Sequence, residues 1–198
     1  MFLDKYRSIT QLKHMRNGIW ENIFKRKNRE LSETAFALRN VPIFSSLSKR
    51  ELREIERLVH HREYTSGEVI FNHGDPGLGM YIIIKGTVQI VNNQDRDNII
   101  VYSELGDGDF FGDLALVDDS DRSATAQSSG DTRLIAFFRP EMQAILTRFP
   151  ALGNKIMVGL AEVIAQRLRK TNEYLIEVQQ QAAEASPAPD SGSKAETA

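Results

Sequence analysis

The sequence predicts a mainly β domain, a sandwich or barrel, with helices before and after it in the chain. Seven short strand-like runs lie between positions 60 and 138, and most of them are rich in β-branched or aromatic residues. Glycines and asparagines, which are common turn formers, separate these runs at intervals of about 8–12 residues. On either side, apolar residues recur every three or four positions, as in amphipathic helices. Many short strands at this spacing are typical of β-sandwiches and barrels.

Length and composition fit one folded domain with extensions. The chain has 198 residues, 41% of them hydrophobic, which is ordinary for a protein with a packed core. It has no cysteine, which excludes disulfides, thiolate nucleophiles and cysteine-ligated zinc. No run approaches the roughly 18 apolar residues of a membrane span, and the first residues lack the apolar centre of a secretory signal. We therefore expect a cytoplasmic protein.

Residues 1–37 are expected to form an N-terminal helical extension. Asn17-Gly18 is a break between two apolar groups at helical spacing, which are Phe2, Leu3, Tyr6, Ile9 and Leu12, then Ile19, Trp20, Ile23 and Phe24. Residues 1–30 hold eight Lys or Arg against three Asp or Glu. A basic amphipathic helix of this kind can lie on an anionic membrane, although such a stripe more often packs on its own domain or on a partner. Both interpretations stay open.

Residues 38–140 are predicted to form the β domain together with a lead-in helix. Ser48 and Glu51 have the spacing of a capping box, which begins a helix expected to run through Val59. The strands are predicted at 60–64, 68–72, 80–85, 87–92, 99–105, 124–128 and 133–138.

Residues 141–181 are predicted to be helical, and residues 182–198 to form a disordered tail. Pro150 divides a short helix from a long one that reaches about Gln181. Residues spaced alternately four and three apart form a coiled-coil seam on the long helix: Ile164, Leu168, Thr171, Leu175, Val178 and Ala182. This seam predicts a parallel homodimer. The alternative is that the helix folds back on its own barrel as a lid.

The segment from Phe110 to Gln127 has the residues of an anion-binding loop. Gly112 lets the backbone turn where a Cβ would obstruct it. Asp113, Leu114 and Ala115 then look like the first turn of a short helix. Free N–H groups at such a helix start point outward and favour a phosphate.

Arg122 completes this predicted site. Its planar guanidinium can donate to two phosphate oxygens at once. The small Ser123 and Ala124 let a ligand lie close to the strand that begins there. An acceptor, exposed N–H groups and a fixed cation together describe a site for a sugar phosphate. The alternative is an ordinary turn in which Arg122 pairs with Asp118 or Asp119.

The same region is acidic. Seven Asp or Glu and no Lys or Arg lie between positions 104 and 121, a field that opposes an anionic ligand unless these side chains point into water. A calcium site built from Asp107, Asp109 and Asp113 is a further alternative, since hard cations prefer oxygen ligands, but the spacing is not that of an EF-hand loop.

The string Phe-Gly-Asp-Leu-Ala-Leu, followed by Arg-Ser-Ala-Thr-Ala with eight residues between Asp113 and Arg122, resembles the phosphate-binding cassette of cyclic-nucleotide-binding domains. That family includes the catabolite activator protein, the regulatory subunits of protein kinase A and cyclic-nucleotide-gated channels. The resemblance covers about residues 38–178 and implies a double-stranded jelly-roll β-barrel, a cyclic mononucleotide ligand (cyclic AMP or cyclic GMP) and no required cofactor. The family usually has Glu at Asp113, where it accepts the ribose 2′-hydroxyl; the shorter Asp predicts weaker binding.

The long helix carries a second part of the resemblance. Residues 164–173 are similar to the dimerising helix of the catabolite activator family, in which a Thr-Ser pair contacts the adenine amino group. Thr171 and Asn172 fall on that pair, and Asn can both donate and accept a hydrogen bond. The resemblance therefore implies adenine recognition here. A polar layer that sets the helix register is the equally weighted alternative.

Two functional hypotheses follow. No helix-turn-helix follows the long helix and the charge outside the first 30 residues is negative, so DNA binding is not expected. No Ser-His-Asp set or carboxylate pair supports catalysis, so we expect no enzyme. The favoured hypothesis is a free-standing sensor that binds cyclic AMP in preference to cyclic GMP and signals through a protein effector or a membrane. The alternative is an assembly module whose pocket no longer binds nucleotide.

Overall fold

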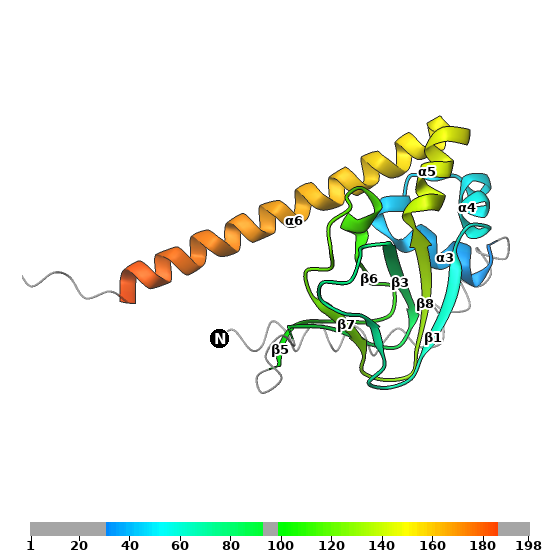
Figure 1. The fold of residues 1–198 in the computed structure, drawn as a ribbon. Helices are drawn as coiled ribbons and strands as arrows, with labels where there is room; N and C mark the ends of the chain where they lie inside the picture. The colour runs from blue at the N-terminus through cyan, green and yellow to red at the C-terminus, as the bar shows by residue number, and fades with distance from the viewer. Residues whose placement is uncertain (1–30, 93–98, 186–198) are drawn as a thin grey trace, which may run out of the picture.

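The structure, a computed structural model, describes residues 31–92 and 99–185, with side chains placed up to residue 181. Figure 1 shows a β domain with helices gathered at one end, from which one long helix projects. The predictions made for residues 1–30 and for the tail beyond residue 185 lie outside the described residues.

Two four-stranded antiparallel sheets form the β domain, as a jelly roll requires. The first has the order β1 (His60–Tyr64), β8 (Thr132–Phe138), β3 (Gly79–Lys85) and β6 (Phe110–Phe111). The second has the order β2 (Val69–Phe71), β7 (Thr125–Ser128), β4 (Val88–Asn92) and β5 (Ile100–Leu105). The mainly β fold class and all seven predicted strands are confirmed. The eighth, β6, has two residues and no alternating pattern that sequence could reveal.

The alternation of side chains along β3 divides the core in two. Tyr81 and Ile83 point between the sheets and pack on residues of β4, β7 and β8. Met80 and Ile82 point to the opposite face and pack under the helices. Successive strand residues face opposite sides, so an uninterrupted apolar run is required where both faces are covered.

The helices cover the outer face of the first sheet. They are α3 (Glu33–Asn40), the 3₁₀ turn η1 (Pro42–Phe44), α4 (Lys49–Glu56), α5 (Arg139–Arg148) and α6 (Pro150–Ala185). Ser48 and Glu51 form the predicted capping box, but α4 ends at Glu56 rather than Val59. The break at Pro150 is confirmed, and α6 runs on past the expected end near Gln181.

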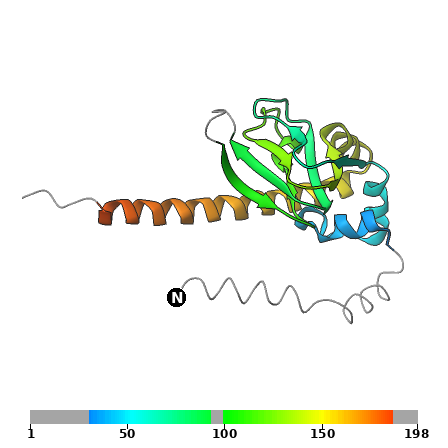
Figure 2. The same cartoon turned by 90° about the horizontal axis from the view of Figure 1, so that it is seen from below.

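The first part of α6 is held tightly against η1. A Cβ at Gly159 would lie 2.5 Å from the Ile43 carbonyl oxygen, so only glycine permits this approach. After Ile164 the helix leaves the barrel, and every residue from 166 to 181 is exposed (Figures 1 and 2). The seam residues between 166 and 181 are therefore not covered by the barrel: Leu168, Thr171, Leu175 and Val178. Among the described residues, no helix has the length and apolar content needed to cross a membrane.

An ion pair between α4 and α6 makes stability depend on acid pH. The Glu51 carboxylate accepts hydrogen bonds from Lys155 Nζ at 2.7 Å and from the Ser48 N–H at 2.8 Å. The Lys155 bond first, then Ser48, lowers the pKa of Glu51 from 4.5 to about 2. Because the folded-state pKa is the lower one, the ionised carboxylate stabilises the fold above pH 4.5, and this contribution is lost as the pH falls from 4.5 towards about 2.

We therefore expect Glu51→Gln to reduce the acid sensitivity of folding. Urea unfolding midpoints of the parent and the variant are compared at pH 7 and at pH 3. The parent should lose more stability between these two conditions than Glu51→Gln does. Equal losses would show that this carboxylate does not link α4 to α6 in solution.

Candidate functional site

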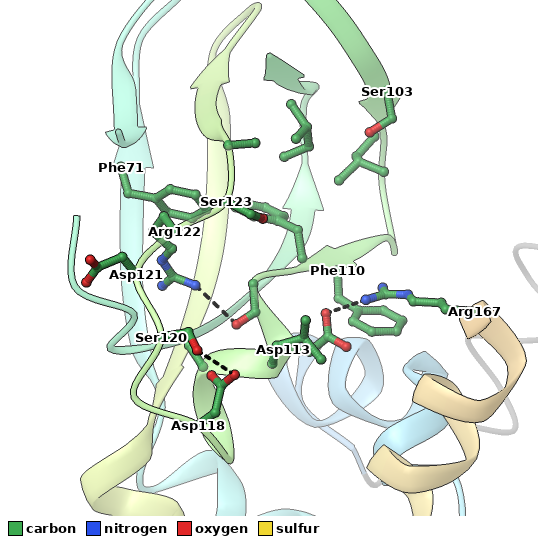
Figure 3. A pocket seen from close by; sticks show the side chains of 17 residues that line it. Phe71, Ser103, Phe110, Asp113, Asp118, Ser120, Asp121, Arg122, Ser123 and Arg167 are labelled. Carbon is green, nitrogen blue, oxygen red and sulfur yellow. Dashed lines mark hydrogen bonds and ion pairs between the residues drawn. The ribbon is translucent and has the colours of Figure 1, made fainter. Parts of the chain in front are cut away.

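The predicted cassette forms one wall of a hollow of about 610 Å³ (Figure 3). β6 leads into Gly112, and the short 3₁₀ helix η2 (Asp113–Leu116) follows it. Gly112 has φ 72°, in the left-handed region, and a Cβ there would lie 2.6 Å from Arg122 Nη1. Glycine is thus required both by the turn and by the approach of the arginine.

Seven predicted site residues line this pocket: Gly112, Asp113, Leu114, Ala115, Arg122, Ser123 and Ala124. The other two, Thr171 and Asn172, do not belong to its lining and are exposed on the projecting part of α6. The Thr171 hydroxyl donates to the Arg167 carbonyl oxygen at 3.0 Å. A single chain in this conformation therefore brings the cassette together without the two residues predicted to read the base.

Arg122 is buried and is held by carbonyl oxygens. Its Nη2 donates to the Gly79 oxygen at 2.7 Å and its Nη1 to the Gly112 oxygen at 3.2 Å. The guanidinium carbon lies 4.1 Å from the centre of the Phe71 ring, which favours a cation over its face. The Nε atom is buried without a hydrogen-bond partner. Burial lowers the pKa of Arg122 from its ordinary value, yet arginine stays charged at neutral pH.

The alternative pairing of Arg122 with Asp118 or Asp119 is not what the structure shows. Asp118 accepts a hydrogen bond from the Ser120 hydroxyl, and Asp119 pairs with Arg139. Within residues 31–92 and 99–185, no carboxylate forms an ion pair with Arg122. Its direct contacts are thus carbonyl oxygens and an aromatic ring, while Asp75 and the acids of the pocket lining act on it only from a distance, so an anion in the pocket would be its first directly bound counter-ion.

Asp113 faces Arg122's pocket from the start of η2 and is also buried, with 1% of its surface exposed. Its Oδ1 accepts a hydrogen bond from Arg167 Nη1 at 2.5 Å, and its Oδ2 is buried without a partner. Arg167 comes from α6, and its guanidinium lies 5.0 Å from the Phe110 ring centre. One oxygen of Asp113 is therefore paired with Arg167 of α6 (Figure 3), and the other is buried without a hydrogen-bond donor.

Sequence reasoning assigned no role to three residues that contact the charged groups of this site: Arg167, Phe71 and Phe110. Arg167 stands four residues before Thr171 and so lies one turn earlier on the same face of the helix, but no local pattern links it to Asp113. Phe71 ends a predicted strand in an ordinary apolar pattern, which does not reveal that its ring supports an arginine.

Two further acids of the region support turns. Asp107 Oδ1 accepts from the Gly86 N–H, and Asp109 Oδ2 from the Gly106 N–H, both at 2.8 Å. In the described part of the chain, no group of three or more His, Cys, Asp or Glu is arranged to hold a metal ion. The calcium alternative therefore has no geometric support here.

Comparison with known proteins agrees with this geometry. Residues 61–149 match the family model described as the cyclic nucleotide-binding domain. Residues 61–149 of this chain correspond to that domain. The matched residues include the whole cassette from Gly112 to Ala124 and every residue of the pocket lining except Arg167.

Several relatives share this nucleotide-binding domain. The cyclic AMP receptor protein of Thermus thermophilus is 30% identical over 135 residues, which are 68% of this chain and 61% of that protein. The cAMP-dependent protein kinase regulatory subunit of Schizosaccharomyces pombe is 32% identical over 159 residues, 80% of this chain and 35% of that subunit. The crystal structure of the Thermus thermophilus catabolite activator protein has a TM-score of 0.62 at 30% identity, covering 70% of this chain and 63% of that one. The chain spans less than two thirds of each.

Proposed function

We propose that this protein is a non-enzymatic sensor that binds a cyclic mononucleotide, with cyclic AMP favoured over cyclic GMP. In this proposal the nucleotide phosphate lies against Arg122 and the first turn of η2, in the pocket between the two sheets. Binding is passed on as a change in contacts with a protein effector or with a membrane.

The observation that carries the proposal is the enclosed charge of Arg122. An enclosed cation without a counter-ion is unfavourable, because carbonyl dipoles replace only part of its hydration. The monoanionic phosphate of a cyclic nucleotide would supply the missing charge, and the unpartnered Nε is a further donor for it. The N–H groups of Asp113 and Leu114 precede the first hydrogen bond of η2, from the Ala115 N–H to the Gly112 oxygen, and so stand at the same end.

A sensor also needs a route from the ligand to the surface, and Arg167 supports one. A ribose hydroxyl that donates a hydrogen bond to Asp113 would change the strength of the Asp113–Arg167 ion pair. This ion pair connects the pocket to α6. The far half of α6 is exposed and free to contact a partner. In this proposal the state of the pocket therefore alters the position of α6, and α6 presents the signal.

The preference for cyclic AMP rests on Thr171 and Asn172. Since these residues lie outside the pocket of their own chain, they can reach a base only if α6 moves or if a second chain provides them. The basic residues 1–30 would favour an anionic membrane as one site of output.

The second candidate function is an assembly module that does not bind nucleotide. The observation that favours it is the same Asp113–Arg167 pair, because a carboxylate that already has a cationic partner has less need of a ribose hydroxyl. The acids Asp118 and Asp121 in the pocket lining also oppose an anion.

A thermal-shift panel separates the two candidates. Cyclic AMP, cyclic GMP and cyclic di-GMP are each added at up to millimolar concentration, with 5′-AMP as the control for nonspecific nucleotide binding. A ligand at one hundred times its dissociation constant stabilises the folded state by roughly 2.7 kcal/mol. We expect the largest shift with cyclic AMP. No shift with either cyclic mononucleotide would support the assembly module, and an equal or larger shift with cyclic GMP would contradict the predicted selectivity alone.

A further inference from the structure

One arginine outside the pocket joins three segments that surround it. Arg139 is the first residue of α5, and its side chain extends back towards the cassette. Its Nε donates to the Ala115 carbonyl oxygen at 2.8 Å, its Nη2 donates to the Gly77 oxygen, and its Nη1 pairs with Asp119. The Arg139 side chain is only 17% exposed, whereas the Asp119 side chain is 94% exposed, so the two bonds to carbonyl oxygens are the sheltered contacts and the ion pair is open to solvent.

The segment that Arg139 contacts, η2, has only weak local interactions of its own. η2 is a 3₁₀ helix of four residues with no side-chain cap. Such short helices have poor hydrogen-bond geometry and leave terminal carbonyl groups unsatisfied. Arg139 supplies a donor and a positive charge to Ala115, near the end of η2 where the helix dipole favours a cation.

The loop from η2 to Arg122 is anchored at both ends. On the far side, the Arg122 N–H donates to the Asp75 oxygen at 2.8 Å, and Asp121 pairs with Pro76 in an isolated bridge. On the near side, Arg139 holds the Ala115 carbonyl oxygen at 2.8 Å, and its pair with the exposed Asp119 adds a weaker contact to the middle of the loop. Only Ser120 and Asp121 then lie between Asp119 and Arg122, so the arginine of the pocket has little freedom to move along the chain.

The Gly77 contact completes this arrangement. A Cβ at Gly77 would lie 2.6 Å from the Ser120 oxygen and 3.0 Å from Ala115 Cβ, so the segment before β3 lies directly against both η2 and the loop. Arg139 donates to the carbonyl oxygens of both Gly77 and Ala115, and it thereby fixes the distance between the segment before β3 and η2. It does not belong to the pocket lining and so acts through the groups it holds.

We propose that Arg139 is the positioning residue of the phosphate site. It holds η2 and the following loop so that the η2 N–H groups and Arg122 face the same point in the pocket before the ligand arrives. This inference rests on the proposed function. A site that is already ordered loses less conformational entropy on binding, which raises affinity without any contact to the ligand.

The test compares dissociation constants for cyclic AMP, measured well below the unfolding temperature, in four variants. Arg139→Gln removes all three contacts, Arg139→Lys keeps the charge but loses the planar fork, and Asp119→Asn removes only the ion pair. The matched control is Arg133→Gln on β8, which removes a surface pair with Glu33 away from the pocket. We expect weakening of about tenfold or more for Arg139→Gln, less for Arg139→Lys and Asp119→Asn, and none for Arg133→Gln. A folded Arg139→Gln that binds within twofold of the parent would overturn the inference.

A second measurement needs no ligand, and so separates this inference from the proposed function. Amide hydrogen exchange of the free protein should become faster at Val117 and Asp118, whose N–H groups bond to the Leu114 oxygen, in Arg139→Gln and in Asp119→Asn. Exchange in β3 and β8 should stay as in the parent, whereas a general loss of stability would accelerate both. If the parent binds no cyclic nucleotide, the proposed function fails while this measurement still decides the role of Arg139. Unchanged exchange at Val117 and Asp118 would refute that role, and if Arg139→Gln does not fold, Asp119→Asn and Arg139→Lys decide it.

Discussion

Replacing Arg122 by alanine is expected to abolish cyclic nucleotide binding while the β domain stays folded. The phosphate would lose the cation that faces it in a buried pocket, and removing one partner of such a charge pair costs about 2–5 kcal/mol, roughly 30- to 5,000-fold in the dissociation constant. Folding should survive, because Arg122 donates to two carbonyl oxygens at the edge of the pocket and does not belong to either apolar core.

The measurement is a calorimetric titration with cyclic AMP, with the fold checked by circular dichroism. Arg122→Lys is the matched variant: it keeps the charge but loses the fork that bridges Gly79 and Gly112, and an intermediate affinity is expected. An Arg122→Ala protein that is folded and binds as tightly as the parent would show that the phosphate lies elsewhere.

The second large effect concerns assembly: the chain is expected to be a parallel homodimer through α6, and Leu168→Glu should dissociate it. Leu168, Leu175 and Val178 are 59%, 50% and 40% exposed in the single chain. Burying one such side chain contributes roughly 1.5–3 kcal/mol, so the seam residues of two chains together can outweigh the unfavourable entropy of association. A charge at position 168 would have to be buried in that seam without a partner.

Light scattering at tens of micromolar distinguishes the states. Ile176→Glu is the control, because Ile176 is as exposed as the seam residues, at 55%, but lies about 100° around the helix from Leu175. We expect the parent and Ile176→Glu to be dimers and Leu168→Glu to be a monomer with its barrel intact. A parent that is monomeric with and without nucleotide would rule out the dimer, and the seam would then have another partner.

The parts of this protein that sequence predicts well are those whose signals are local. The strands follow from short strand-like runs and the turn residues between them, and Ser48 with Glu51 marks the start of α4 because a capping box needs only four residues. The cassette from Gly112 to Ala124 is likewise one continuous stretch, so its residues can be predicted to lie in one pocket before the fold is known.

The parts that sequence did not reveal depend on contacts between distant segments. Arg167 reaches Asp113 across 54 positions of the chain, and no local pattern encodes that meeting. Phe71 supports Arg122 only because β2 pairs with β7. Conversely, Thr171 and Asn172 are predicted as site residues from their resemblance to the Thr-Ser pair of the catabolite activator family, but in this structure α6 leaves the barrel before it reaches them.

A crystal structure of the protein with cyclic AMP will decide whether Arg122 and η2 hold the phosphate of a cyclic mononucleotide. We expect phosphate oxygens within hydrogen-bonding distance of the Arg122 guanidinium and of the N–H groups at the start of η2, with the ribose 2′-hydroxyl at Asp113 Oδ2. An empty pocket at saturating nucleotide, with Arg122 still bound only to the Gly79 and Gly112 oxygens and Asp113 only to Arg167, would contradict this expectation.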